Sequence, residues 1–509
     1  MARLKEYNGH YCESEYEYAF IGFLEAEGWK YSSGNNISRV TKRDVLIADD
    51  FKKFIADTNP DLTEDEVIQI YDNVRLVGAE SDFATLHKVY GWMVNGVQFT
   101  TQDGLPRMIP LIDFDNWDKN IFRVVNQFTV EYTNNGQKEN RRPDVLLFVN
   151  GMPLCVIELK NPADANATIY DAWEQINIRY WRDIPHLLHY CPLACISDGV
   201  KTRLGTVRTP YEHFYAWRRV NEGDAVSTLP FAETETMIKG VYAPERFMEI
   251  FRDYIYFQDS IYDSDEVEII CRYPQFFAAK LLKQSIVNSV VTRSGKGGTY
   301  FGATGCGKTY TMAFLARQLA LRCTDIPEIG SPTIILIVDR DELQKQGSKL
   351  FTKSKEFLNL GEVSVVKNRT QLRQELGARQ SGGFYICTIQ KFCDRKDDKI
   401  GLINDRQNII CFSDEAHRTQ LEHSKKIQFS KDADENMKAM VSKPYAKVLK
   451  EAFPHATFVG FTGTPIAETY QTFGDEIDRY TMDQAVADGL TVSIKYHPRI
   501  AKVLLDNKK

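Results

Sequence analysis

The chain has 509 residues, of which 43% are hydrophobic, and its 63 basic and 69 acidic residues give a formal net charge of −6. This length exceeds what one hydrophobic core supports, so two or three domains are expected, while the modest net charge leaves the kind of partner open. The sequence has no apolar run of about 18 residues and no apolar N-terminal segment, which argues against a membrane partner or a secretory signal and favours a cytoplasmic protein.

The first predicted element is an amphipathic helix in SEYEYAFIGFLEAEGWKY, residues 14–31, which ends near Gly28. The next strong pattern is RRPDVLLFVNGMPLCVIELK, residues 141–160, where an apolar run enters and leaves Asn150-Gly151. This pattern predicts a β-hairpin. Glu158 and Lys160 are two apart on its second strand, so they share one face.

Whether Asp144 joins that face depends on the loop. A two-residue turn would pair Asp144 with Ile157 and place it on the opposite face from Glu158. A three-residue loop at 149–151, with Gly151 in the left-handed conformation, pairs Asp144 with Val156 and restores the common face. We therefore predict the three-residue loop.

Two carboxylates and a lysine on one face can hold Mg²⁺ against a phosphodiester, with Asp144 and Glu158 as metal ligands and Lys160 orienting the attacking water. The alternative is a hairpin whose exposed end merely carries three charges. The pattern P-D-x(13)-E-x-K resembles the catalytic core of the PD-(D/E)xK nucleases.

That resemblance implies further site residues. Glu17 on the first helix could add a carboxylate, with Glu15 as the other candidate. Downstream, DAWEQINIRYW contains Gln175 and Tyr180, which are similar to a Gln and Tyr pair of the RecB-like branch. The family pair is four residues apart and this pair is five apart, so we expect a role for Gln175 and leave that of Tyr180 open.

A domain boundary is predicted within residues 256–272, where acidic residues interrupt the pattern. We assign 1–260 to the first domain and 261–480 to the second. In the second domain, helical stretches alternate with β-branched runs at 333–339, 363–367, 384–390, 408–415 and 457–464. Near-continuous apolar strands separated by helices predict a parallel sheet flanked by helices.

The segment FGATGCGKTYTM, residues 301–312, fits G-x-x-x-x-G-K-T between a short strand and a helix. Such a glycine-rich loop lets backbone N–H groups converge on phosphates at a helix N-terminus. Lys308 would contact the β and γ phosphates of ATP, and the Thr309 hydroxyl would bind Mg²⁺. A glycine-rich turn without a ligand is the alternative. The remaining nucleotide-binding candidates in the loop are Gly302, Thr304, Gly305 and Gly307.

NIICFSDEAHR, residues 408–418, supplies the acidic groups that a phosphate-binding loop needs, and we expect them at the end of a neighbouring strand. Asp414 suits Mg²⁺, and Glu415 suits the base that positions the attacking water. Acidic residues after a strand can also be simple helix caps. The tetrad from Asp414 to His417 nevertheless follows the loop in the order that nucleotide-driven motors use.

Together these segments resemble the first RecA-like domain of a superfamily 2 DEAH-box helicase or translocase. RYPQFFA, with Gln275, resembles the adenine-reading segment of that family. Three later segments resemble motifs that contact nucleic acid or couple it to ATP: IVDRDELQKQ with Asp339 and Arg340, TIQKF with Thr388, Gln390 and Lys391, and FTGTP with Thr462, Gly463, Thr464 and Pro465.

A nuclease of this branch followed by such a motor domain resembles the R subunit of type I restriction enzymes. The resemblance implies an α/β protein in which a nuclease domain with a mixed sheet precedes a RecA-like domain with a parallel sheet. It also implies ATP and Mg²⁺ as cofactors, translocation on and cleavage of double-stranded DNA, and methyltransferase and specificity subunits as partners. Because only one RecA-like domain is recognised, 481–509 would begin a second one, and we expect a poor ATPase.

Two other functions stay open. A repair-type helicase–nuclease would degrade linear DNA with ATP and without partner subunits. A non-enzymatic DNA-binding assembly subunit would use Mg²⁺ and ATP only to set its conformation. Two complete sets of residues argue against the non-enzymatic subunit, because a scaffold needs neither. They are Asp144, Glu158 and Lys160 in the first domain, and Lys308, Asp414 and Glu415 in the second.

Overall fold

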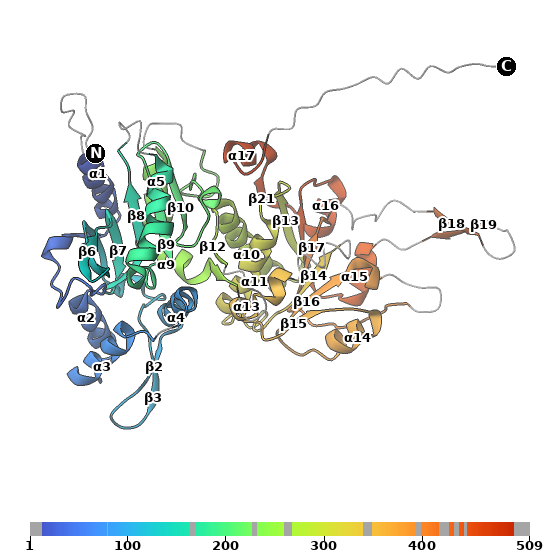
Figure 1. Ribbon diagram of the computed structural model, residues 1–509. Coiled ribbons are helices and arrows are strands. Elements are labelled where there is room, and N and C mark those ends of the chain that lie inside the picture. Colours follow the sequence, from blue (N-terminus) through green and yellow to red (C-terminus); the bar gives the residue numbers. More distant parts are fainter. Residues whose placement is uncertain are drawn as a thin grey trace, which may run out of the picture.

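The structure is a computed structural model, and it describes residues 13–78, 80–161, 168–225, 232–258, 267–338, 349–392, 399–416, 427–431, 437–441 and 445–492. Its described residues form an N-terminal part within 13–258 and a C-terminal part within 267–492, each built around one large sheet. The ribbon view shows the N-terminal part in blue to green beside the C-terminal part in yellow to red (Figure 1).

The N-terminal sheet is mixed, as predicted, with six strands in the order β1-β4-β7-β8-β9-β10. Strands β1 and β4 are parallel, as are β8 and β9, and the other neighbours are antiparallel. Every residue of β7 and β8 is buried, which explains why these central strands are apolar apart from Glu158. The strands are β1 (Lys30–Ser33), β4 (Phe122–Asn126), β7 (Val145–Val149), β8 (Met152–Leu159), β9 (Leu193–Ser197) and β10 (Thr202–Thr206).

Helices and two hairpins surround this sheet. The predicted first helix is α1 (Glu13–Ala26), which packs against β1 and β8, and α5 (Ile169–Glu174) packs against β8 and β9. The hairpins are β2 (Val97–Thr100) with β3 (Pro106–Ile109), and β5 (Val130–Asn134) with β6 (Gln137–Arg141). The other α-helices are α2 (Ala48–Thr58), α3 (Glu64–Arg75), α4 (Asp82–Asn95), α6 (Trp181–Asp183), α7 (Pro185–Leu188), α8 (Ala232–Met237) and α9 (Pro244–Asp253).

The loop between β7 and β8 differs from the prediction. Val149 pairs with Met152, so Asn150 and Gly151 form a strict two-residue turn, both with positive φ (49° and 75°). This is the geometry of a type I′ hairpin turn. A Cβ atom at Gly151 would overlap the Ile47 carbonyl oxygen, so the turn packs closely against the start of α2.

The extra residue that the three-residue loop would have supplied lies inside β8 instead. Leu147 pairs with Cys155 and Phe148 pairs with Pro153, which leaves Leu154 as a β-bulge. Pro153 has no N–H to donate and favours such an irregular position. The bulge restores the common face by another route, and Asp144 lies opposite Glu158 rather than Val156.

The C-terminal sheet is parallel, as predicted, and has seven strands in the order β15-β16-β14-β17-β20-β13-β21. All five apolar runs singled out in the second half form strands of this sheet. The sequence did not indicate the edge strand β21, which lacks an apolar run. The strands are β13 (Lys296–Gly302), β14 (Thr333–Val338), β15 (Val363–Val365), β16 (Phe384–Thr388), β17 (Ile409–Asp414), β20 (Thr457–Thr462) and β21 (Glu476–Tyr480).

Helices flank this sheet, and α10 and α16 both pack against β13 and β20. Two short pairs stand outside the large sheets: β11 (Ile255–Phe257) with β12 (Glu268–Ile270), and β18 (Ile427–Lys431) with β19 (Met437–Val441). The helices are α10 (Tyr273–Thr292), α11 (Lys308–Arg322), α13 (Lys355–Leu358), α14 (Arg369–Gly377), α15 (Tyr445–Ala452), α16 (Ala467–Phe473) and α17 (Met482–Ala487).

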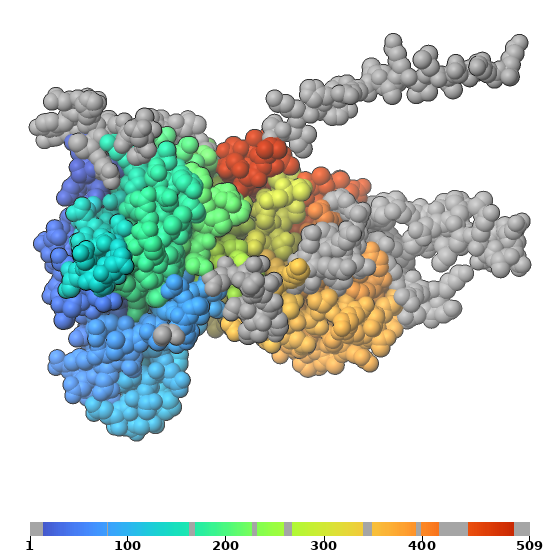
Figure 2. Space-filling model, viewed as in Figure 1, coloured from blue at the N-terminus to red at the C-terminus, as the bar shows by residue number. Residues whose placement is uncertain are grey.

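The two parts share buried contacts, and the space-filling view shows them touching (Figure 2). Trp217 packs against Phe276 with ring centroids 5.7 Å apart, and Tyr254 packs against Phe314 at 5.5 Å. The division into 1–260, 261–480 and 481–509 stays a prediction, since one apolar core crosses its first boundary. Within the described residues, no helix is long and apolar enough to cross a membrane.

Candidate functional site

Two carboxylates meet where β7 begins and β8 ends. Asp144 is 8% exposed and Glu158 is fully buried. Asp144 Oδ2 accepts a 2.8 Å hydrogen bond from the Leu159 N–H, and the Asp144 N–H donates to Glu158 Oε1 at 3.4 Å. Backbone pairing therefore holds both acids side by side.

Gln175 and Tyr180 both reach Glu158. Gln175 Nε2 donates to Glu158 Oε2 at 2.7 Å, and the Tyr180 hydroxyl donates to Oε1 at 2.6 Å. Gln175–Tyr180 is a π-helical turn, in which hydrogen bonds span five residues instead of four. The five-residue spacing, which left Tyr180 in doubt, therefore places it on the same face as Gln175.

Lys160 follows β8 and is half-buried. Its Nζ donates to Gln175 Oε1 at 3.1 Å, and its backbone N–H donates to the Ser197 carbonyl oxygen at 2.8 Å. Gln175 thus connects the lysine to Glu158 through one amide group. The predicted group of Asp144, Glu158, Lys160 and Gln175 lies together in the structure.

The electrostatics of this cluster favour a bound cation. Burial raises the pKa of Glu158 well above its ordinary value, and the nearby Asp144 carboxylate raises it further, while Lys160 and the Tyr180 hydroxyl oppose the shift. Burial also raises the pKa of Tyr180. Two acids and one lysine leave the site short of positive charge. Because Mg²⁺ prefers carboxylate oxygens, the donor set fits this ion.

Glu17 lies on α1 and reaches the end of β4, the strand next to β7. It is 5% exposed, and its carboxylate accepts hydrogen bonds of 2.6 Å from Asn126 Nδ2 and from Gln127 Nε2. The Gln127 N–H in turn donates to the Asp144 carbonyl oxygen at 3.0 Å. Glu15 is half-buried, so the buried Glu17 is the better placed of the two.

The glycine-rich loop connects β13 to α11. Gly305 and Gly307 have φ of 82° and 87°, a conformation that side chains disfavour. In the described part of the chain, no hydrogen bond engages the N–H groups of these two glycines. Such N–H groups at the start of α11 form a cradle that fits phosphate oxygens. Thr304 is exposed within the loop, and Thr309 is half-buried in the first turn of α11.

Lys308 points back across the loop. Its Nζ donates to the Gly302 carbonyl oxygen at 3.2 Å and lies 3.9 Å from Glu415 Oε1. A side chain at Gly302 would contact Lys308 Cγ at 3.0 Å, so glycine leaves room for this lysine. The lysine is therefore held between the loop and the acidic pair.

Asp414 ends β17, and Glu415 follows it with φ of 47°. Burial raises the pKa of Asp414, Glu415 raises it further, and Lys308 opposes the shift. We had expected the strand that carries these acids to be a neighbour of β13. This expectation was wrong, because β20 lies between β17 and β13. Gly463, just after β20, faces the loop, since a side chain there would lie 3.3 Å from Thr304 Oγ1.

A cavity of about 460 Å³ adjoins the glycine-rich loop. Its lining includes Gln275, Tyr310, Gly305 and Gly307 from the C-terminal part, and seven residues within 208–217 from the N-terminal part. Gln275 Nε2 donates to the Gly307 carbonyl oxygen at 3.4 Å. The cavity therefore lies beside the glycine-rich loop, between the two parts of the chain.

Sequence reasoning missed two residues of this cavity. The Arg272 guanidinium lies 3.5 Å from the centre of the Tyr215 ring, in a cation–π contact between the two parts of the chain. Arg272 is itself the first residue of the segment RYPQFFA, so the sequence offered a signal for it that was not used. Tyr215 carried no signal, because its place depends on how the two parts pack.

Comparison with known proteins gives matches over both parts. A family model described as type I restriction enzyme R protein N terminus matches residues 11–213, and one described as SWI2/SNF2 ATPase matches residues 274–509. The type I restriction enzyme HindI endonuclease subunit of Haemophilus influenzae is 31% identical over 98% of this chain and 47% of its own length. Over nearly its whole length, this chain is similar to a type I restriction enzyme endonuclease subunit.

Other type I endonuclease subunits match in the same way. The putative MjaIXP endonuclease subunit of Methanocaldococcus jannaschii is 30% identical over 97% of this chain and 46% of its own length. The chain thus spans about half the length of the curated relatives that it matches. A solved fragment of a putative HsdR subunit of a type I restriction enzyme from Vibrio vulnificus covers 74% of the chain at 16% identity and a TM-score of 0.26, a likeness too slight to support an argument.

Some residues of the predicted motor motifs lie outside the described residues, namely Asp339, Arg340 and His417. Thr388 ends β16, and Gln390 and Lys391 lie in the 3-10 turn Ile389–Lys391 that follows. Thr462 ends β20, and its hydroxyl accepts a 3.1 Å hydrogen bond from the Thr464 N–H. Of these two strands, β20 adjoins β17, whereas β14 lies between β16 and β17.

Proposed function

We propose that this chain cuts double-stranded DNA with Mg²⁺ in its N-terminal part and binds ATP with Mg²⁺ in its C-terminal part. The observation that carries the proposal is the cluster of Asp144, Glu158 and Lys160, linked by Gln175 and Tyr180. A hairpin end with no chemical role does not need two buried carboxylates, because burying acidic groups is costly unless a ligand or partner compensates.

In this proposal Asp144 and Glu158 are the metal ligands of the nuclease. Mg²⁺ bound between them would neutralise and polarise the phosphodiester. Lys160 orients the attacking water and is itself oriented by the Gln175 amide. Gln175 and Tyr180 together fix the rotation of the Glu158 carboxylate, and Glu17 supports the neighbouring strand through Asn126.

The nucleotide site would use the loop cradle and the adjoining cavity. The N–H groups of Gly305 and Gly307, within the loop from Gly302 through Thr304, would bind phosphate oxygens, and Lys308 would contact the β and γ phosphates. Thr309 and Asp414 are the proposed Mg²⁺ ligands, Glu415 positions the attacking water, and Gln275 reads the adenine.

Activities of the complete enzyme extend this proposal. ATP-driven translocation on double-stranded DNA needs a second RecA-like domain, whose arginine contributes about 10³ to 10⁵ in rate. The methyltransferase and specificity subunits are the proposed partners, and the specificity subunit would supply the target sequence. Because duplex DNA and ATP are intracellular molecules, we propose a cytoplasmic location.

One experiment separates a restriction subunit from a repair enzyme. The chain is mixed with candidate methyltransferase and specificity subunits in the presence of ATP and Mg²⁺, and its association with them and its cleavage of unmethylated and methylated circular DNA are measured. A restriction subunit joins the complex and cuts only the unmethylated circle. ATP-dependent degradation of linear DNA by the chain without partners would instead support the repair enzyme.

A further inference from the structure

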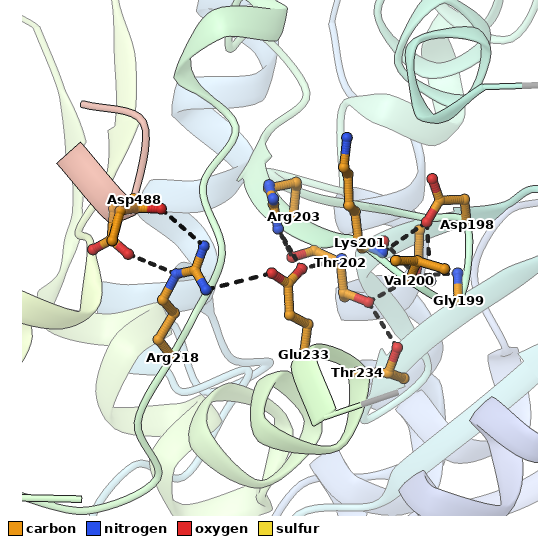
Figure 3. Close-up of polar contacts among 12 residues, drawn as sticks. Asp198, Gly199, Val200, Lys201, Thr202, Arg203, Arg218, Glu233, Thr234 and Asp488 are labelled. Atoms are coloured by element: carbon orange, nitrogen blue, oxygen red, sulfur yellow. Dashed lines mark hydrogen bonds and ion pairs between the residues drawn. The ribbon is translucent and has the colours of Figure 1, made fainter. Parts of the chain in front are cut away.

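The carboxylate of Asp488, just after α17, gathers three partners from both parts of the chain. It lies 2.6 Å from Arg218 Nε of the N-terminal part and accepts hydrogen bonds of 2.7 Å from the hydroxyls of Tyr273 and Tyr480. The side chains of Arg218 and Asp488 are only 19% and 9% exposed. Figure 3 shows the ion pair bridging the two parts. We call it the Arg218–Asp488 clamp.

On the motor side, both tyrosines lead directly to the nucleotide site. Tyr273 begins α10 two residues before Gln275, the proposed adenine reader. Tyr480 ends β21, and its carbonyl oxygen accepts a 2.8 Å hydrogen bond from the Ala303 N–H inside the glycine-rich loop. Movement of Asp488 would therefore act on the base end and on the phosphate end of the pocket.

On the nuclease side, Arg218 leads to the edge of the N-terminal sheet. Its Nη1 lies 3.6 Å from Glu233 Oε1, and the other oxygen of Glu233 accepts a 3.0 Å hydrogen bond from the Thr202 N–H (Figure 3). The Thr202 hydroxyl contacts Ser197 Oγ at 2.7 Å, and the Ser197 carbonyl oxygen accepts from the Lys160 N–H at 2.8 Å. An unbroken series of polar contacts thus joins the clamp to the catalytic lysine.

We propose that the Arg218–Asp488 clamp couples occupancy of the ATP pocket to the nuclease strand that carries Lys160. Arg218 is a positioning residue, because it acts through Glu233 and Asp488. The inference rests on the proposed ATP and nuclease sites and adds the route between them. A bound nucleotide would order Gln275 and Ala303. Through Asp488 and Arg218 it would also reduce the local opening of β10 at Thr202.

The physical basis is the cost of leaving a buried charge unpaired. With Arg218 and Asp488 in contact, each compensates the desolvation of the other, and loss of either leaves the remaining charge in a poorly hydrated place. Such a pair is strong only in one relative placement of the two parts. By linkage, a nucleotide that favours this placement is in turn bound more tightly because of it.

The test measures hydrogen exchange of the whole 509-residue chain with and without a non-hydrolysable ATP analogue and Mg²⁺. In the wild type, the analogue should slow exchange of the Lys160 and Thr202 amides. Arg218→Ala should abolish this slowing and weaken analogue binding about fivefold or more, within the usual range of coupling between sites. Arg218→Lys, which keeps the charge, should restore part of both effects.

Two further variants separate coupling from simple loss of stability. Asp488→Asn keeps an acceptor for the two tyrosine hydroxyls but removes the charge that pairs with Arg218, so it should behave like Arg218→Ala. Arg107→Ala removes an ion pair with Asp61 on the N-terminal part away from the clamp, and it should change neither readout.

The clamp is refuted if Arg218→Ala keeps the slowed exchange and binds the analogue within about twofold of the wild type. A wild-type chain that bound no analogue at all would refute the proposed ATP site, and the role of the clamp with it. Binding without slowed exchange at Lys160 in the wild type would refute the clamp alone.

Discussion

The Tyr180 hydroxyl donates a 2.6 Å hydrogen bond to Glu158 Oε1, although Tyr180 lies five residues beyond Gln175. Gln175 Nε2 also donates to the Tyr180 hydroxyl oxygen at 2.9 Å, so the three side chains form a closed set. In this set the Glu158 carboxylate receives one donor on each oxygen. Its orientation toward Asp144 is therefore fixed before any cation binds.

Tyr180→Phe tests this set with little change in shape. The substitution removes one hydrogen bond to an acidic group, worth about 1.5–3 kcal/mol, and leaves Gln175 in place. We expect Mg²⁺-dependent DNA cleavage to fall about 10- to 100-fold, while analogue binding at the ATP pocket is unchanged. Cleavage at the wild-type rate would show that Tyr180 plays no part in the site.

Deletion of Ile178 tests the π-helical turn. Ile178 is 47% exposed within that turn, and its removal would leave Gln175 and Tyr180 four apart on an ordinary α-helix. We expect the variant to fold, with its thermal unfolding near that of the wild type, and to retain DNA cleavage. A variant that folds but does not cut would show that the π-turn itself, and not only the face it creates, is required.

Glu158→Gln tests the raised pKa through stability. Below pH about 4.5, the ordinary value, the Glu158 carboxyl is protonated in the folded and unfolded chains and costs nothing. Above that pH the unfolded chain ionises first, so the wild type loses stability as the pH rises toward the raised pKa of the folded state. Glutamine mimics the neutral form.

Without divalent metal, the Glu158→Gln variant should therefore be more stable than the wild type by about 1 kcal/mol or more at neutral pH, since one pKa unit is worth about 1.4 kcal/mol. The difference should vanish in acid. Mg²⁺ should stabilise the wild type and not the variant, because it binds the ionised pair. Thermal unfolding at several pH values measures all three effects, and a difference that grew in acid would contradict the account.

Lys308→Ala tests the separation of the two sites. The substitution removes a charged donor from the phosphates, so affinity for ATP should fall about 10- to 100-fold. Mg²⁺-dependent cleavage by the N-terminal part should persist, because the described polar contacts of Lys308 are with Gly302 and Glu415 in the C-terminal part. Fluorescence titration with a labelled nucleotide measures the first effect, and undiminished affinity would remove Lys308 from the site.

Much of the fold followed from sequence because buried parallel strands are apolar throughout. The runs at β14, β16, β17 and β20 were visible for this reason. Strand β21 was missed because EIDRY is mostly charged, and four of its five residues keep some exposure at the sheet edge. Hydrophobic pattern alone cannot distinguish such a strand from a loop.

The candidate site could be predicted in composition but not in its local geometry. Alternation along strands required Asp144 and Glu158 to share a face if they act together, and the structure meets that requirement through a bulge at Leu154 instead of a longer loop. The tight packing of Gly151 against Ile47 favours the two-residue turn. Contacts of this kind join residues about a hundred positions apart, and local sequence carries no record of them.

The most direct test of the central claim is cleavage of supercoiled duplex DNA by the purified chain with Mg²⁺, compared between the wild type, Lys160→Ala and Lys308→Ala. The account predicts nicking by the wild type and by Lys308→Ala, and a loss of about 10²- to 10⁴-fold in Lys160→Ala, the range for a group that moves or orients protons. Thermal unfolding confirms that each variant is folded. Equal nicking by a folded Lys160→Ala variant would contradict the assignment of the nuclease site.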